Sequence, residues 1–130
     1  MSDRTLRDEA RLYFVPYILG NSRAAHRLAA KIHRKFGIIS VICDDRRSVL
    51  DLLDLTSRTV VLSATDSSRL LAEQLISLAQ QNCCTLPLLI PTDGKYASTI
   101  QAEREMLERT FVFADADRLF ESSPLMKIAK

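Results

Sequence analysis

Short apolar runs alternate with amphipathic segments along nearly the whole chain, and this alternation is the feature that most limits its fold. Residues 14–19 (FVPYIL), 38–43 (IISVIC) and 59–64 (TVVLSA) have the length and apolar content of strands that are buried on both faces. Shorter runs follow at residues 86–90 and 111–113. Because helix-like segments separate these strands, the sequence predicts a mostly parallel sheet with helices on both faces.

The helix-like segments carry their own start and stop signals. Ser22 is a good N-cap and Gly37 a good C-terminal stop, so a helix is expected between them. Asp66 or Ser67 is expected to cap a later helix, and Tyr96 begins the apolar pattern of another. A short helix after residue 44 is expected to place four apolar residues on one face: Val49, Leu52, Leu53 and Leu55.

The chain has 130 residues, which fits one domain. We expect a three-layer Rossmann-like α/β domain with about five mostly parallel strands over residues 14–124. Residues 1–13 are then an N-terminal extension, and residues 125–130 the start of a linker.

Charge and apolar patterning limit the partners and the cellular compartment expected for the protein. Eighteen Lys plus Arg against sixteen Asp plus Glu give a net charge of +2, so the total charge does not indicate nucleic acid as a partner. Apolar runs are too short for a membrane span, and residues 1–11 lack the apolar core of a secretory signal. With three cysteines, an odd count, the chain is expected to be cytoplasmic with free thiols. A homo-oligomer remains compatible with all of this.

Ligands of parallel α/β sheets gather beyond the carboxyl ends of the strands, near the point where the strand order reverses. The loop after the first strand offers Gly20, Asn21, Ser22 and Arg23 at the start of a helix, where backbone N–H groups favour an anion. Opposite them, the loop after the fourth strand offers Thr92 and Asp93. These six residues are the predicted contacts with a substrate or anion.

A second interpretation is a nucleotide-binding or metabolite-binding regulatory module. Asp44 follows the second strand, where dinucleotide-binding folds place the acid that binds a ribose, and Arg46 and Arg47 would suit a 2′-phosphate. The glycine fingerprint of such sites is incomplete, because Ser22 and Ala25 stand where its second and third glycines would be.

Other chemistries find less support in the sequence. No Walker A lysine motif and no GxSxG motif occur, so we assign no catalytic residue. His26 and His33 are too far apart along one helix to share a metal ion, and no metal site is predicted. The same helix holds cations at 23, 27, 31, 34 and 35 without an acid between them, which indicates a solvated face or a surface for an acidic partner.

Three segments together resemble the N-terminal, pre-ATP-grasp domain of ATP-grasp enzymes, closest to the carboxylate–amine ligase-like branch that includes D-aspartate ligases. They are residues 16–20 (PYILG) with the helix end 29–40 (AAKIHRKFGIIS), residues 88–100 (LLIPTDGKYASTI), and residues 111–127. The resemblance implies a domain that forms one wall of a substrate cleft. It also implies ATP and magnesium for a full-length ligase, held mainly by an ATP-grasp core that would be this domain's partner, so the chain alone is not expected to be an active enzyme.

Overall fold

A five-stranded sheet in the order β3-β2-β1-β4-β5 forms the centre of the protein. The computed structural model describes residues 14–63, 66–81 and 86–114. All four pairs of neighbouring strands are parallel. The strands are β1 (Phe14–Leu19), β2 (Ser40–Asp44), β3 (Ser57–Val61), β4 (Leu86–Pro91) and β5 (Val112–Phe113). The helices are α2 (Arg23–Phe36), α3 (Leu50–Leu53), α4 (Ser68–Gln80), α5 (Gly94–Ala102) and α6 (Arg104–Leu107).

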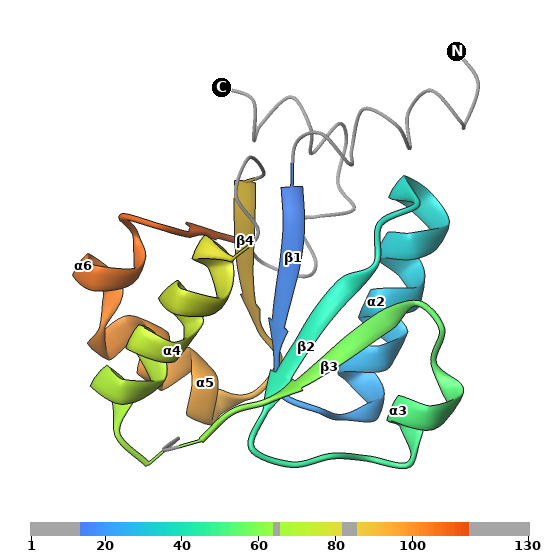
Figure 1. Ribbon diagram of the computed structural model, residues 1–130, viewed down its shortest axis with the longest axis horizontal. Coiled ribbons are helices and arrows are strands. Elements are labelled where there is room, and N and C mark those ends of the chain that lie inside the picture. The colour runs from blue at the N-terminus through green and yellow to red at the C-terminus, as the bar shows by residue number, and fades with distance from the viewer. Residues whose placement is uncertain (1–13, 64–65, 82–85, 115–130) are drawn as a thin grey trace.

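Helices cover the sheet from both sides (Figure 1). Helices α2 and α3 lie on one side, and α4, α5 and α6 lie on the other. The predicted three-layer Rossmann-like α/β fold is therefore confirmed, and the sheet is wholly parallel where the sequence predicted mostly parallel strands. The predicted extension 1–13, the predicted linker 125–130 and residues 115–124 of the predicted domain lie outside the described residues.

Strand β1 contributes to two apolar cores, one on each face of the sheet. Phe14 and Ile18 pack under α2, where the Phe14 and Phe36 rings meet edge to face with centroids 5.3 Å apart. Tyr17 and Leu19 join the other core, beneath the helices of the opposite layer. The central strand is thus apolar along its length because both of its faces are covered.

Proline 16 lies inside β1, although the sequence favoured a strand start or a sheet edge for it. Gly20 N–H donates to Cys43 O of β2 at 2.9 Å. Backbone groups alternate in direction along a strand, so the even-numbered residues of β1 turn theirs toward β2. Pro16 is one of them, but the ladder between β1 and β2 begins only at the pair Tyr17 and Val41. The missing N–H therefore removes no ladder hydrogen bond.

Helix α3 differs most from the sequence prediction. Its four residues bury no side chain, and the expected apolar face points outward, with Leu52 84% and Leu55 87% exposed. The prediction that these residues form a packed face was wrong. Polar contacts of Asp51 and Asp54 hold α3 in place, and apolar packing does not. The last predicted helix is also divided into α5 and α6, since the backbone leaves helical geometry at Glu103.

Gly20 is predicted to tolerate no side chain. Its φ is +110°, and a Cβ atom built there would lie 2.5 Å from Thr92 Oγ1. We expect Gly20→Ala to lower the free energy of unfolding by roughly 1–3 kcal/mol, measured by urea denaturation. Gly94→Ala is the matched control, because a Cβ atom there meets nothing within 4 Å. Equal stability of the two variants would contradict this account of the turn.

Candidate functional site

The loops after β1 and β4 meet at the carboxyl ends of the two strands. Thr92 donates to Leu19 O from both its backbone N–H, at 3.0 Å, and its hydroxyl, at 2.7 Å. Asp93 Oδ2 lies 3.2 Å from the position of a Cβ atom on Gly20. Three of the predicted site residues, Gly20, Thr92 and Asp93, are therefore brought together from segments more than 70 residues apart. We call this contact region, with Ser22 and Arg23, the β1–β4 edge.

Two predicted contact residues at the β1–β4 edge are helix caps. Ser22 Oγ accepts a hydrogen bond from Ala25 N–H at 3.3 Å at the start of α2. Asp93 Oδ1 accepts from Tyr96 N–H at 2.9 Å at the start of α5. Arg23 is exposed at the first position of α2, whose first turn contains no acid. The edge therefore presents an exposed guanidinium on one helix start and a carboxylate on the other.

Asp44 joins the neighbouring loops instead of presenting an open carboxylate. Its Oδ2 accepts from Asn21 N–H at 2.7 Å, and its Oδ1 accepts from Tyr96 OH at 2.6 Å and from Asp45 N–H at 2.7 Å. Burial and this hydrogen bond to the Asp44 carboxylate raise the pKa of Tyr96 above its ordinary value, so its phenol stays a donor. A ribose would have to compete with three donors that Asp44 already accepts.

Arg46 and Arg47, the other residues of the nucleotide interpretation, are exposed. Arg46 Nε lies 3.9 Å from Asp45 Oδ1, and Lys95 Nζ lies 3.6 Å from Asp45 Oδ2. On the outer face of α2, Arg27 and Lys31 are exposed as well. None of the salt bridges within the described ranges involves either of these two cations.

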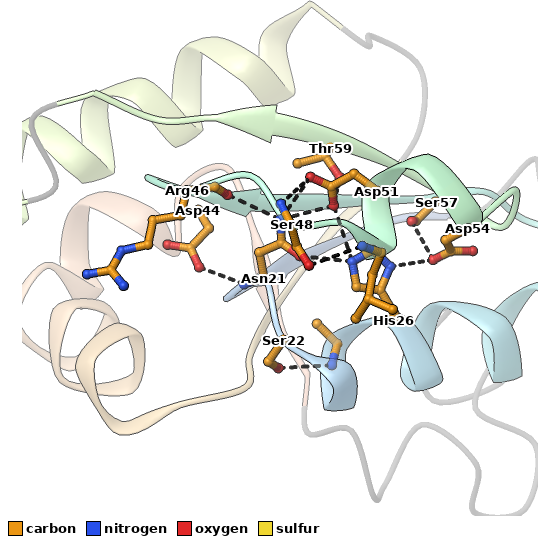
Figure 2. Close-up of polar contacts among 12 residues, drawn as sticks. Asn21, Ser22, His26, Asp44, Arg46, Ser48, Asp51, Asp54, Ser57 and Thr59 are labelled. Atoms are coloured by element: carbon orange, nitrogen blue, oxygen red, sulfur yellow. Dashed lines mark hydrogen bonds and ion pairs between the residues drawn. The ribbon is translucent and has the colours of Figure 1, made fainter.

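Asn21 turns its side chain away from the β1–β4 edge and into a polar cluster beside α2 (Figure 2). Its amide Nδ2 donates to Arg46 O at 3.1 Å and to the two Asp51 carboxylate oxygens at 3.0 and 3.2 Å. Its Oδ1 lies 2.8 Å from His26 Nε2, and Asp54 Oδ2 lies 2.6 Å from His26 Nδ1. We call Asn21, His26, Asp51 and Asp54 the His26 cluster.

The contacts of the His26 cluster fix the orientation of its side chains. Every partner of Asn21 Nδ2 is an acceptor, so the amide orientation is fixed and Oδ1 faces His26. His26 Nε2 then faces this acceptor and Asp51 Oδ1 at 3.3 Å, while His26 Nδ1 faces Asp54. Both ring nitrogens of His26 therefore face acceptors, Nε2 the Asn21 amide oxygen and Nδ1 the Asp54 carboxylate. Its exposed fraction is only 7%.

Both carboxylates of the His26 cluster are stabilised as anions. Burial alone would raise the pKa of Asp54, but hydrogen bonds from Thr56, His26 and Ser57 outweigh it and lower the pKa to about 2. Burial opposes ionisation of Asp51 in the same way. Hydrogen bonds from Ser48 N–H, Thr59 OH and the Asn21 amide, with the charge of His26, lower its pKa below the ordinary value. The cluster therefore clamps α3 and the start of β3 against α2.

Sequence reasoning considered His26 only as a metal ligand and missed this clamp. The one signal was the spacing of Asp51 and Asp54, which puts two acids on one helical face near an apolar stretch. Their histidine partner lies 28 residues from Asp54 in the sequence. Such a pairing depends on the βαβ topology and cannot be read from local periodicity.

No group of three His, Cys, Asp or Glu side chains within 14–63, 66–81 and 86–114 is arranged to hold a metal ion. At the β1–β4 edge, a phosphate near Gly20 would meet the Asp93 carboxylate, and Asn21 N–H is already donated to Asp44. Burial also raises the pKa of the Cys43 thiol to about 12, so this cysteine is no thiolate nucleophile.

No family model, curated protein or solved structure matches the chain significantly.

No helix in the described part of the chain is long and apolar enough to cross a membrane.

The His26 cluster predicts an acid-dependent loss of stability that Asp54→Asn removes. A folded-state pKa of about 2 against 3.8 for the unfolded chain contributes about 2 kcal/mol. Since the pKa is lowered, this contribution is present above pH 3.8 and is lost as the pH falls through about 2. The difference in free energy of unfolding between wild type and Asp54→Asn should therefore shrink from about pH 5 to about pH 2 in urea titrations.

Asp66→Asn is the control for this titration, since Asp66 is exposed on the loop before α4. Its free energy of unfolding should follow that of the wild type at every pH. A difference between wild type and Asp54→Asn that stays constant over the same pH range would show that Asp54 stabilises the fold by packing and not as an anion.

Proposed function

We propose that this protein is the substrate-side domain of an ATP-dependent carboxylate–amine ligase of the ATP-grasp type, and that it binds the acceptor without catalysing ligation alone. In such a reaction ATP phosphorylates a carboxylate, and an amine attacks the resulting acyl phosphate. ATP and magnesium belong in this proposal to an ATP-grasp core domain. The support from sequence is the resemblance of residues 16–40, 88–100 and 111–127 to the first domain of that family.

The single observation that carries the proposal is the convergence of two loops at the β1–β4 edge. The sheet order places the strand reversal between β1 and β4, which is where open α/β sheets bind ligands. Five of the six predicted contact residues, all except the Asn21 side chain, belong to this edge. The proposal therefore rests on the place where the sheet topology brings these two loops together.

The charges at the edge favour a ligand that carries both signs. Arg23 and the α2 N-terminus attract a carboxylate, while Asp93 beside Gly20 attracts an ammonium group. A bare phosphate would meet the Asp93 carboxylate at close range. An amino acid, with its α-carboxylate and α-amine, fits this pair of charges and is also an amine acceptor of the kind the proposed ligase needs.

A nucleotide-binding regulatory module is the second candidate function, and the exposed Arg46 and Arg47 are the observation that favours it. Against it stands Asp44, whose carboxylate is already bound to Asn21, Tyr96 and Asp45. The two candidates differ in the ligand that stabilises the folded chain.

A thermal-shift panel separates the two candidates. We expect free amino acids to raise the melting temperature, and ATP, NAD and NADP to leave it unchanged; a ligand at about 100 times its Kd stabilises the folded state by about 2.7 kcal/mol. Arg23→Gln should abolish the shift, whereas Arg27→Gln, one turn further along α2, should retain it. Stabilisation by a nucleotide with no response to amino acids would favour the regulatory module instead.

An ATPase assay tests the proposal that this domain does not catalyse the reaction alone. With ATP and magnesium, the chain alone should show no turnover above background. Robust magnesium-dependent hydrolysis would overturn the assignment of a non-catalytic, substrate-side domain.

A further inference from the structure

Exposed apolar side chains gather around β3, the strand at one edge of the sheet. Eight large apolar residues are exposed in the described part of the chain, and two of them, Ile39 and Val112, lie elsewhere. The other six lie at α3, on both ends of β3 and at the start of α4: Val49, Leu52, Leu53, Leu55, Val61 and Leu70. Exposed apolar side chains that gather on one part of a monomer's surface can mark an interface.

The backbone of β3 has one side that pairs with β2 and one side that faces away from the sheet. Leu62 N–H donates to Asp44 O at 2.7 Å, and Thr56 O accepts from Ser40 N–H at 3.4 Å, so even-numbered residues turn toward β2. Backbone groups alternate along a strand, and those of Ser57, Thr59 and Val61 therefore point outward. Within the described ranges no strand pairs with this side. β3 contains no proline, and its one charged residue is Arg58.

We propose that β3 pairs antiparallel with β3 of a second copy of this chain, about a two-fold axis at Thr59. Thr59 then lies opposite its own copy, and Ser57 lies opposite Val61 of the second copy. In this register every outward N–H and C=O of the three residues faces a partner group, so the two sheets become continuous. A two-fold axis brings identical residues together, as in most homodimers.

Charge complementarity selects a second copy over an unrelated strand. Arg58 is exposed and shares its face of the sheet with Val60 and Leu62, whose side chains pack on the α4 side. On that face a groove between β3 and α4 is lined by Val60, Leu62, Leu70, Leu78 and the acid Glu73. In the proposed register Arg58 lies opposite Val60 of the second copy, at the entrance to that copy's groove. In this proposal Arg58 of each chain joins Arg69 of the other in pairing with Glu73, whose Oε1 lies 3.5 Å from Arg69 Nε.

The opposite face of the sheet carries exposed leucines near both ends of the joint. Leu55 lies two residues before β3, and Leu52 and Leu53 lie on α3. Asp51 holds α3 to β3 by accepting a hydrogen bond from Thr59 OH at 2.9 Å. In the proposed register Leu55 of each copy lies just past Val61 of the other copy, so the leucines of the two copies flank the joint at its two ends. The hydroxyls of Thr59 and Ser57 are already bound by Asp51 and Asp54, so their side chains do not compete for the outward backbone groups.

A charge exchange tests the register of this dimer. By analytical ultracentrifugation the wild type should be a dimer at micromolar concentration. Arg58→Glu and Glu73→Arg should each raise the dissociation constant roughly tenfold or more, and the double variant should return it to within about threefold of wild type. Arg109→Glu, an exposed charge reversal near β5, should leave it unchanged. A monomer at every accessible concentration overturns the proposal, and so does a double variant that is not rescued.

Proline in the outward register gives an independent test of the strand pairing. Val61 N–H points away from β2, so Val61→Pro removes a hydrogen bond of the proposed dimer and none of the monomer's ladder. We expect a folded monomer by circular dichroism and sedimentation. Val61→Thr keeps the N–H group and should remain dimeric. A Val61→Pro protein that stays dimeric would place the interface elsewhere and overturn the proposal.

Discussion

The close approach of the chain at Gly20 is the constraint on which the rest of the molecule depends. Strand β1 is the central strand and pairs with β2 on one side and β4 on the other. At its end, Gly20 N–H remains bound to β2 while Leu19 O accepts two hydrogen bonds from Thr92. There is no room for a Cβ atom between these two attachments. One glycine thus holds three strands in register and sets the spacing of the β1–β4 edge.

The His26 cluster determines what lies beside that edge. Helix α3 has four residues and no buried side chain, so apolar packing does not hold it on the sheet. Leu52 and Leu55 are 84% and 87% exposed and contribute no such packing. Buried ion pairs by themselves contribute little net stability, because desolvation offsets their attraction. Their effect here is positional: a histidine ring that meets an acceptor at each of its two nitrogens fixes where α3 lies. The exposed leucines are therefore held at the β3 edge.

Much of this fold follows from sequence pattern, and the exceptions have identifiable causes. Ser22 and Gly37 gave the ends of α2 because capping is local chemistry. The five strands and their parallel arrangement followed from alternation of apolar runs. The sequence wrongly predicted a packed apolar face at Val49, Leu52, Leu53 and Leu55. Periodicity shows which residues share a face of a helix, but it does not show whether another element covers that face. The sequence could place Gly20, Thr92 and Asp93 together because the ends of parallel strands lie at one edge. It could not predict that the Asn21 side chain turns toward His26, because the two acids around that histidine lie far from it in the sequence.

The hydrogen bonds of Asn21 connect the two surfaces that carry the proposals. Thr59 on β3 donates to Asp51, Asp51 accepts from the Asn21 amide, and Asn21 N–H donates to Asp44. Asp44 in turn accepts from Tyr96 of α5, the helix that Asp93 caps. Each bond in this path is 2.6–3.0 Å long and has a single chemical direction, because carboxylates only accept and the amide orientation is fixed. Asn21 therefore joins β3, through Asp51, to the loop after β1, and the edge strand and the candidate ligand site lie on one continuous path of hydrogen bonds.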